Sequence, residues 1–300
     1  MDLRTIKTYQ TIVKYDSFQR AAEVLYYAQS TVTTQIKNLK TNLGVILLEK
    51  DNDIQLIEAG RLLHDKGEAL LNGSENLQGA VNDLVDGEEG IIRIGVMEPT
   101  ASFRLPAIIS SFKKEFPKVQ VKIQIQSSKV INEMLKKDEI DIALCTTPDI
   151  VEGTYFEPLF SEEVVLLIPN THYLRSNEVV LLKHLQNEEL LITKADCPFR
   201  SNLEKQMKEN GLVLKNGIEV SDLLALRDYV QANIGVAVVP NITVIPPPKG
   251  TLIKPIIDYK NGLTVGILTN VERFNRTKAM MRLMELLENK LKDNLMEMYA

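Results

Sequence analysis

Apolar residues at helical spacing predict three short helices in the first 44 positions of the chain. The first helix is indicated by Leu3, Ile6, Tyr9, Ile12 and Val13. Asp16 and Ser17 interrupt that pattern, and Ser17 is a favourable N-cap for a second helix over 18–25. A third helix is expected from about Ser30 to Gly44, where the glycine ends it. Two short apolar runs then flank residues 51–53, which predicts a small hairpin or wing.

The third helix combines a narrow apolar face with an unusually polar one. Val32, Ile36, Leu39 and Leu43 fall within about 60° of one another on a helical wheel. The opposite face consists of short hydroxyl and amide side chains with a single charge: Ser30, Thr34, Lys37, Asn38 and Thr41. Such side chains match the donors and acceptors that base edges present in the major groove of DNA. A polar helix that follows another helix after a short turn therefore indicates a DNA-binding helix–turn–helix, with a threonine-rich surface helix as the alternative.

A long helix is expected over 58–88, and four leucines recur in it every seven residues: Leu63, Leu70, Leu77 and Leu84. This spacing is typical of a coiled-coil seam and predicts that two copies of the chain pair along it. The alternative is an ordinary amphipathic helix that packs on its own domain. We place the DNA-binding domain at 1–60 and the linker and dimerisation helix at 61–88.

From residue 89 onward, short apolar runs that are typical of strands alternate with helical stretches. The strands are expected at 91–97, 119–125, 140–145, 163–169, 189–193, 235–240 and 263–269, and the helices at 104–116, 129–137, 198–210, 222–232 and 272–296. This alternation predicts an α/β domain with a mainly parallel sheet. Its length favours two lobes, one over 89–161 and 266–300 and the other over 162–265. Three consecutive prolines at 246–248 indicate a rigid surface connection.

Composition and charge narrow the class of protein. The 300 residues carry a net charge of −5 and 44% hydrophobic residues, enough for a sizeable core. Residues 1–60 hold seven basic and seven acidic side chains, so the expected DNA-binding domain has no basic excess. Two cysteines fit a reducing compartment, and three scattered histidines do not suggest a zinc site. We expect a cytoplasmic protein, because the N-terminus lacks a signal peptide and no run is long enough for a membrane span.

The stretch over 17–50 resembles the winged helix–turn–helix of LysR-type transcriptional regulators. The matching residues are Ser17, Phe18, Ala21, Ala22, Leu25, Gln29, Ser30, Thr33, Gln35, Ile36, Leu39, Leu43 and Gly44. The resemblance extends over essentially the whole chain, through Glu58-Ala59-Gly60 and the segments at 93–96, 141–144 and 171–174. It implies an α/β protein overall, with a winged helix–turn–helix, a linker helix and a two-lobed effector domain like that of periplasmic binding proteins. This chain departs from the family at Lys40, at 47–50 and in the wing at 51–54. The last two departures replace basic residues, so we expect modest non-specific DNA affinity.

The resemblance also implies which residues contact DNA. Carried over by position, the set is Gln29, Ser30, Thr31, Thr33, Thr34, Gln35 and Lys37, to which we add Ser17, Asn38 and Lys50. Glutamine makes bidentate hydrogen bonds to adenine, and threonine offers a methyl group to thymine and a hydroxyl to phosphate. Lys37, Lys50 and the region of Ser17 are expected to hold the DNA backbone.

The resemblance implies a ligand cleft between the two lobes, and polar turns at the carboxyl ends of four expected strands are the candidates for its walls. These turns contribute Thr100, Ser102, Ser127, Ser128, Thr146, Thr147, Cys197, Phe199 and Arg200. Each turn taken alone is equally explained as a helix cap. Arg104 and Arg200 favour a small anionic metabolite, whereas Glu98 and Asp196 count against it. Cys197 at a helix N-terminus leaves a thiol-based redox sensor as the alternative, although a packed and inert thiol explains it as well.

The resulting hypothesis is a bacterial, LysR-type regulator that binds double-stranded promoter DNA and responds to a small-molecule effector. The expected assembly is a homo-oligomer, a homodimer or a homotetramer built as a dimer of dimers, and RNA polymerase is a further candidate partner. The sequence offers no catalytic constellation, so we expect no enzyme, no cofactor, no metal site and no membrane association. A free-standing solute-binding protein would not need residues 1–88.

Overall fold

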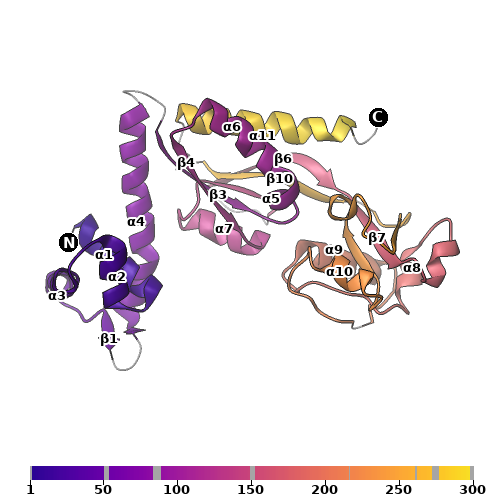
Figure 1. Ribbon diagram of the computed structural model, residues 1–300, viewed down its shortest axis with the longest axis horizontal. Coiled ribbons are helices and arrows are strands. Elements are labelled where there is room, and N and C mark those ends of the chain that lie inside the picture. Colours follow the sequence, from indigo (N-terminus) through magenta and orange to yellow (C-terminus); the bar gives the residue numbers. More distant parts are fainter. Residues whose placement is uncertain are drawn as a thin grey trace. The chain divides into compact units, whose positions relative to one another are not determined.

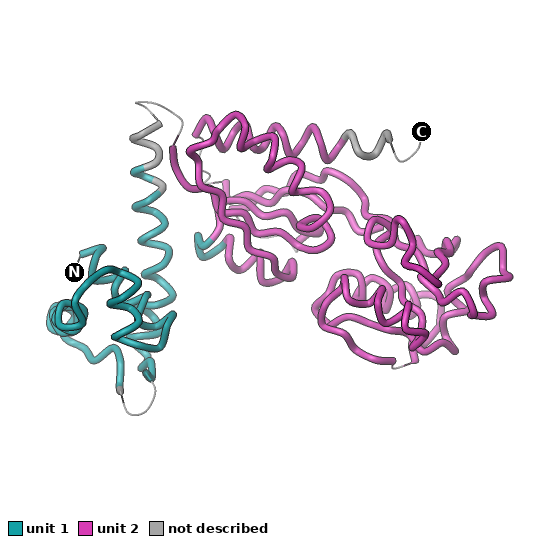
Figure 2. The backbone as a smooth tube through the Cα atoms, viewed as in Figure 1, with its two compact units in different colours: residues 1–86, 136–139 teal, residues 87–135, 140–300 magenta. Residues whose placement is uncertain are grey.

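The computed structural model describes residues 2–50, 54–83, 89–148, 153–215, 217–260, 262–271 and 277–297. The chain divides into two compact units, one formed by 1–86 with 136–139 and the other by 87–135 with 140–300 (Figure 2). Among the described residues, no helix combines the length and apolar character that a membrane-spanning segment needs.

The first unit is a three-helix module with a hairpin and a long final helix (Figure 1). Its elements are α1 (Leu3–Tyr15), α2 (Phe18–Leu25), α3 (Gln29–Leu43), β1 (Leu48–Lys50), β2 (Ile54–Leu56) and α4 (Glu58–Asp83). β1 and β2 pair antiparallel, which confirms the predicted wing, although its tip at 51–53 lies outside the described residues. Ser17 caps α2 by accepting a hydrogen bond from the backbone N–H of Arg20 at 3.2 Å. Gly44 ends α3 in the left-handed conformation with φ of 71°, as the sequence predicts.

A small core holds α1, α2, α3 and the wing together. It comprises Tyr9, Ile12, Ala21, Ala22, Val32, Ile36, Leu39, Leu47 and Leu48. The expectation that Leu43 extends the buried face of α3 is wrong, because its side chain is exposed at the last turn of the helix. The Tyr9 hydroxyl donates a buried hydrogen bond of 2.9 Å to the carbonyl of Gly60, and so fixes the start of α4 against α1.

Helix α4 buries its first turns in this core and leaves later leucines exposed. Leu63 is half-buried against the core of the module, so it serves the fold of its own chain. Leu70 and Leu77 are exposed, as is Leu62. Leu84 lies outside the described residues.

The second unit contains a five-stranded and a three-stranded sheet (Figure 1). The first sheet has the order β4-β3-β5-β10-β6, and its strands are β3 (Gly90–Val96), β4 (Val119–Ile125), β5 (Ile142–Thr146), β6 (Thr154–Glu162) and β10 (Leu263–Asn270). The second has the order β8-β7-β9, with strands β7 (Val164–Pro169), β8 (Ala237–Pro240) and β9 (Thr251–Lys254). The helices are α5 (Thr100–Phe103), α6 (Leu105–Glu115), α7 (Ser128–Lys136), α8 (Leu182–Leu185), α9 (Pro198–Glu209), α10 (Leu226–Gln231) and α11 (Lys278–Glu297), with 3₁₀ turns η1 (Tyr173–Ser176) and η2 (Asn241–Val244).

The prediction of a mainly parallel sheet is wrong. Among the described strands of the five-stranded sheet, β3 pairs parallel with β4 and β5, whereas β10 runs antiparallel to β5 and β6. Every pairing in the three-stranded sheet is antiparallel. Residues 189–193 form isolated bridges in place of the expected strand, and β6 and β9 were not expected.

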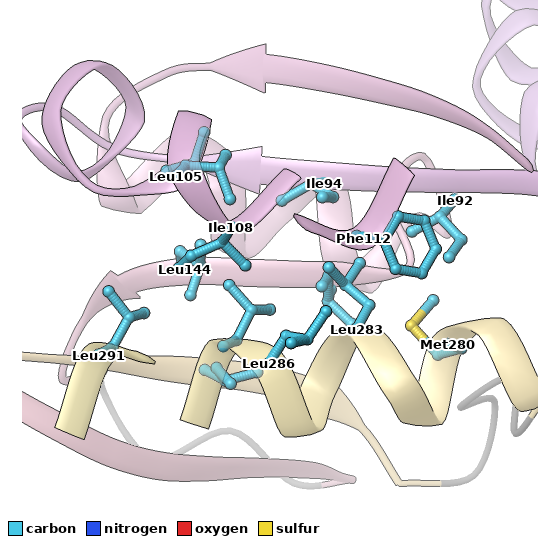
Figure 3. Close-up of a cluster of buried hydrophobic side chains, with 14 of the residues drawn as sticks. Ile92, Ile94, Leu105, Ile108, Phe112, Leu144, Met280, Leu283, Leu286 and Leu291 are labelled. Atoms are coloured by element: carbon cyan, nitrogen blue, oxygen red, sulfur yellow. The ribbon is translucent and has the colours of Figure 1, made fainter. Parts of the chain in front are cut away.

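Apolar side chains alternate along the strands and fill cores on both faces of the five-stranded sheet. Ile142 and Leu144 of β5 face the core under α6 and α11, whereas Ala143 and Cys145 face a second core that includes α7. Figure 3 shows how Leu105, Ile108 and Phe112 of α6 meet Met280, Leu283 and Leu286 of α11 over the strands. The interlocking of these side chains makes the sheet a rigid base for the loops at its strand ends.

Candidate DNA-binding helix and effector pocket

Helix α3 presents a polar face without acidic side chains. Seven of the residues expected to contact DNA are exposed on or beside it: Gln29, Ser30, Thr31, Thr33, Thr34, Lys37 and Asn38. Val32, Ile36 and Leu39 are buried on the opposite face. The module therefore holds α3 by three apolar side chains and leaves the polar face open to a partner.

Two threonine hydroxyls of this face bond to the backbone of their own helix. Thr33 donates to the carbonyl of Gln29 at 3.0 Å, and Thr34 donates to that of Ser30 at 2.8 Å. Each hydroxyl oxygen then keeps its lone pairs, so it acts as an acceptor toward an incoming donor. Gln35 is half-buried, and its amide oxygen accepts a hydrogen bond from the Thr8 hydroxyl. One half of the bidentate contact expected from Gln35 is therefore used inside the module.

On α2 and α3, two of the three cations are engaged in contacts within the module. Lys37 is exposed on the polar face, whereas Lys40 donates to the carbonyl of Leu48 at 3.2 Å. Arg20 pairs with Glu23 at 2.8 Å on the surface of α2. The side chain of Lys50 lies outside the described residues. Ala28, the N-cap of α3, has no side-chain acceptor for the first N–H groups of that helix, and the Thr31 N–H donates to the Ala28 carbonyl at 2.9 Å.

A cavity of about 500 Å³ opens in the second unit. Its lining comes from the ends of β3 and β4, the starts of α7 and α9, and a loop before α10. The lining residues are Met97, Glu98, Ile125, Gln126, Ser127, Ser128, Thr193, Lys194, Asp196, Cys197, Pro198, Phe199, Ser221, Asp222, Leu223 and Leu224. A cavity of this size suits a small metabolite.

Four of the expected effector residues line the cavity: Ser127, Ser128, Cys197 and Phe199. The hydroxyl of Ser127 is buried without a hydrogen-bond partner. Ser128 is occupied, since its oxygen accepts from the Thr146 hydroxyl at 3.1 Å and from the Thr146 backbone N–H at 3.3 Å. A buried hydroxyl without a partner loses hydrogen bonds that water would provide, so Ser127 is suited to bind a ligand.

The other expected residues do not line the cavity. Thr100 is fully buried and its hydroxyl has no partner, whereas Ser102 is exposed and bonds to the Glu98 carboxylate at 2.8 Å. Thr147 is exposed, and the Thr146 hydroxyl donates a hydrogen bond to the lining residue Ser128. The lining residues of the loop over 221–224 were not expected, because α10 after it has no polar N-cap.

The expectation that Arg104 and Arg200 are free to bind an anion is wrong. Arg104 forms a buried ion pair with Glu162 at 2.9 Å, and its guanidinium lies 4.5 Å from the centre of the Phe160 ring. Arg200 is held by two carboxylates at 2.7 Å, those of Glu204 and Glu219. Both guanidinium groups therefore serve to stabilise the fold.

The two cysteines are not bonded to each other. Cys145 is fully buried in the sheet, and this burial raises the pKa of its thiol to about 12. A thiol with so high a pKa is almost entirely protonated near neutral pH and therefore reacts slowly with oxidants. Cys197 is half-buried at the N-cap of α9, beside the cavity.

A winged helix–turn–helix followed by an α/β domain with a ligand-sized cavity defines a DNA-binding regulator with a separate small-molecule domain. Comparison with known proteins agrees with this class. The family model described as bacterial regulatory helix-turn-helix protein, lysR family, matches residues 3–61, and that of the LysR substrate binding domain matches 86–292. The HTH-type transcriptional regulator YtlI of Bacillus subtilis (strain 168) is 34% identical over 280 residues, which cover 93% of this chain and 91% of YtlI.

Solved structures show the same fold at lower identity. Full-length CbnR in complex with its target DNA superposes with a TM-score of 0.77 at 18% identity, over 97% of this chain and 100% of CbnR. A full-length OxyR variant from Pseudomonas aeruginosa gives a TM-score of 0.71 at 20% identity, over 97% of this chain and 95% of that one. The chain belongs to the LysR family of transcriptional regulators, and its C-terminal part is an effector-binding domain.

Proposed function

We propose that this regulator recognises a specific promoter sequence by placing α3 in the major groove of double-stranded DNA. The observation that carries the proposal is the open face of α3, with seven exposed hydroxyl, amide or ammonium side chains and no acid. Base edges accept hydrogen bonds from such groups, whereas a face that serves solubility alone usually carries charges of both signs.

The residues of this face divide by chemistry into two roles. Gln29, Thr31 and Asn38 have the donors and acceptors to contact base edges, together with Ser30, Thr33 and Thr34. Lys37, Lys50 and the region of Ser17 hold phosphates, helped by the uncapped N–H groups at the start of α3. Gln35 orients the helix through its bond to Thr8 and offers its remaining amide N–H to a base.

Replacement of hydroxyls on α3 tests this proposal. Thr31→Val and Thr34→Val keep the shape of the side chain and remove the hydroxyl that we place on a base edge, so we expect affinity for a site selected from random duplexes to fall about tenfold while affinity for unrelated DNA is unchanged. Thr11→Val is the matched control, since Thr11 is a helical threonine that bonds back to Lys7 on α1. Equal losses of affinity for the selected and the unrelated duplex would show that these α3 hydroxyls do not recognise bases.

The second part of the proposal is that a small molecule with an anionic group binds in the cavity and changes promoter activity. α7 and α9 both begin at its wall, where their first N–H groups have no partner within the helix. Lys194 and the unpartnered hydroxyl of Ser127 lie on the same lining.

A reporter of promoter activity tests the cavity in cells. Ser127→Val fills the place of the hydroxyl with a methyl group, and it should abolish the response to the effector while DNA affinity stays that of the parent. Ser176→Ala, an exposed serine outside the cavity, is the control. An unchanged response of Ser127→Val would exclude this cavity as the effector site.

We further propose that the protein acts as a dimer or a dimer of dimers, in the cytoplasm and without catalysis, and that RNA polymerase is a partner at the promoter. The exposed Leu70 and Leu77 on α4 support pairing. The proposed domain limits remain 1–60, 61–88 and 89–300. Cys145 does not support the redox alternative, because burial raises the pKa of its thiol to about 12.

A further inference from the structure

The charges around the cavity are not those of a site built for a simple anion. Among the described residues that line it, three are acids and one is a base: Glu98, Asp196 and Asp222 against Lys194. Arg104 and Arg200, the neighbouring guanidinium groups, are held in ion pairs by Glu162, Glu204 and Glu219. A ligand with negative charge alone would therefore meet a wall with a net charge of about −2, which opposes its binding by Coulomb repulsion.

We propose that the effector is a small zwitterion of the α-amino-acid class, with a protonated amine that the carboxylates of the cavity bind. This inference rests on the proposed effector site and specifies what that site binds. An ammonium group donates three hydrogen bonds, and bonds from a cation to carboxylates are stronger than bonds between neutral groups.

The carboxylates keep the capacity to accept these bonds. Glu98 accepts from the backbone N–H and the hydroxyl of Ser102 at 3.3 and 2.8 Å, one bond to each carboxylate oxygen. Asp222 accepts from the backbone N–H of Leu224 at 2.8 Å through one of its two oxygens. Because a carboxylate has about four lone-pair sites, both groups can bind an ammonium without losing the bonds that fix their loops.

The anionic end of the ligand has a separate place in the same cavity. The starts of α7 and α9 supply backbone N–H groups, and the buried Ser127 hydroxyl has no partner in the protein. This pair of independent features matches a carboxylate, which accepts several hydrogen bonds at once. Cationic and anionic subsites in one cavity of about 500 Å³ fit a molecule whose opposite charges are close together.

The rest of the lining indicates the remainder of the ligand. Met97, Ile125, Phe199, Leu223 and Leu224 give the cavity apolar walls. Such walls favour a ligand whose side chain is apolar. The predicted ligand is thus an amino acid with an apolar side chain.

Calorimetry and thermal shift on the full-length protein test the proposal. The probes are the twenty common L-amino acids, the N-acetyl derivative and methyl ester of each, and succinate, benzoate and inorganic phosphate as simple anions. We expect at least one apolar amino acid to raise the melting temperature. Its N-acetyl derivative lacks the ammonium and should bind at least about tenfold more weakly, as hydrogen bonds to charged groups imply.

Variants assign the ammonium subsite. Asp196→Asn and Asp222→Asn should each weaken the amino acid about tenfold and leave the affinity of its N-acetyl derivative unchanged. Glu178→Gln removes an exposed carboxylate outside the cavity and should change neither affinity. The proposal is overturned if no amino acid shifts the melting temperature, if the N-acetyl derivative binds as well as its parent, or if both aspartate variants bind the amino acid normally. If a simple anion binds and Ser127→Val abolishes that binding, the proposal of a zwitterionic ligand is overturned while the proposed effector site is retained.

Discussion

Truncation of two leucines on α4 should weaken pairing of the chain. Leu70 and Leu77 are 47% and 68% exposed, and both lie beyond the turns that pack against the helix–turn–helix core. Alanine is the best helix former, so Leu70→Ala with Leu77→Ala keeps α4 helical while it removes three carbons at each position.

The size of the effect follows from the exposed area. At about 0.8 kcal/mol for each buried carbon, three carbons contribute about 2.4 kcal/mol when transfer from water is complete. Weighted by the two exposed fractions, the pair contributes about 2.8 kcal/mol per chain, or about 5.5 kcal/mol in a symmetric dimer. The dissociation constant of the dimer should therefore rise by about four orders of magnitude.

Sedimentation equilibrium over a range of protein concentrations measures this constant, and circular dichroism checks that the helix content is retained. Val213→Ala removes an apolar side chain that is 72% exposed in the other unit, and it should leave the dimer unchanged. A double variant that is still helical and sediments with the dissociation constant of the parent would show that α4 does not pair through these leucines.

Four further substitutions test the fold. Gly60→Ala should lower the free energy of unfolding by about 2 kcal/mol or more, because the added Cβ would lie 2.1 Å from the carbonyl oxygen of Leu47. Gly73→Ala, where nothing lies within 4 Å, should raise it by up to about 1 kcal/mol in the same denaturant titration. Ala28→Ser should supply the missing cap of α3 and raise the melting temperature through a gain of about 1 kcal/mol. Burial raises the pKa of Glu162 from 4.5 to about 7, so between these pH values the folded state holds a proton that the unfolded state has lost. Stability should therefore fall as pH rises from 4.5 to 7, and Glu162→Gln should remove this part of the pH dependence in thermal melts across that range.

The sequence predicted the first unit well because its signals are local. The N-cap at Ser17, the glycine at the end of α3 and the apolar spacing of Val32, Ile36 and Leu39 each act within a few residues. The exception is Leu43, whose spacing fits the buried face of α3 although its side chain is exposed.

Strand direction in the second unit depends on contacts between distant segments. β10 runs antiparallel between β5 and β6, although more than 100 residues of sequence separate it from each of them. β6 was missed because Pro158 and four polar residues leave it without a regular apolar pattern, and the bulge between Val265 and Gly266 of β10 accommodates the irregular pairing.

The effector site was predicted in part for the same reason. Polar residues at helix starts are visible in sequence, and they led to Ser127, Ser128, Cys197 and Phe199. Two ion partners are not visible in the sequence, because Glu162 reaches Arg104 and Glu219 reaches Arg200 only through the fold. The sequence therefore suggested free cations where the structure has ion pairs.

The salt dependence of binding to a footprinted promoter site tests most directly whether α3 reads bases with few phosphate contacts. Paired modules that depend on base contacts should protect two half-sites of a partly palindromic sequence, with a shallow decline of log affinity against log salt and much weaker binding to unrelated DNA. Binding that is equal on unrelated duplexes and is lost steeply as salt rises would contradict the proposed role of α3.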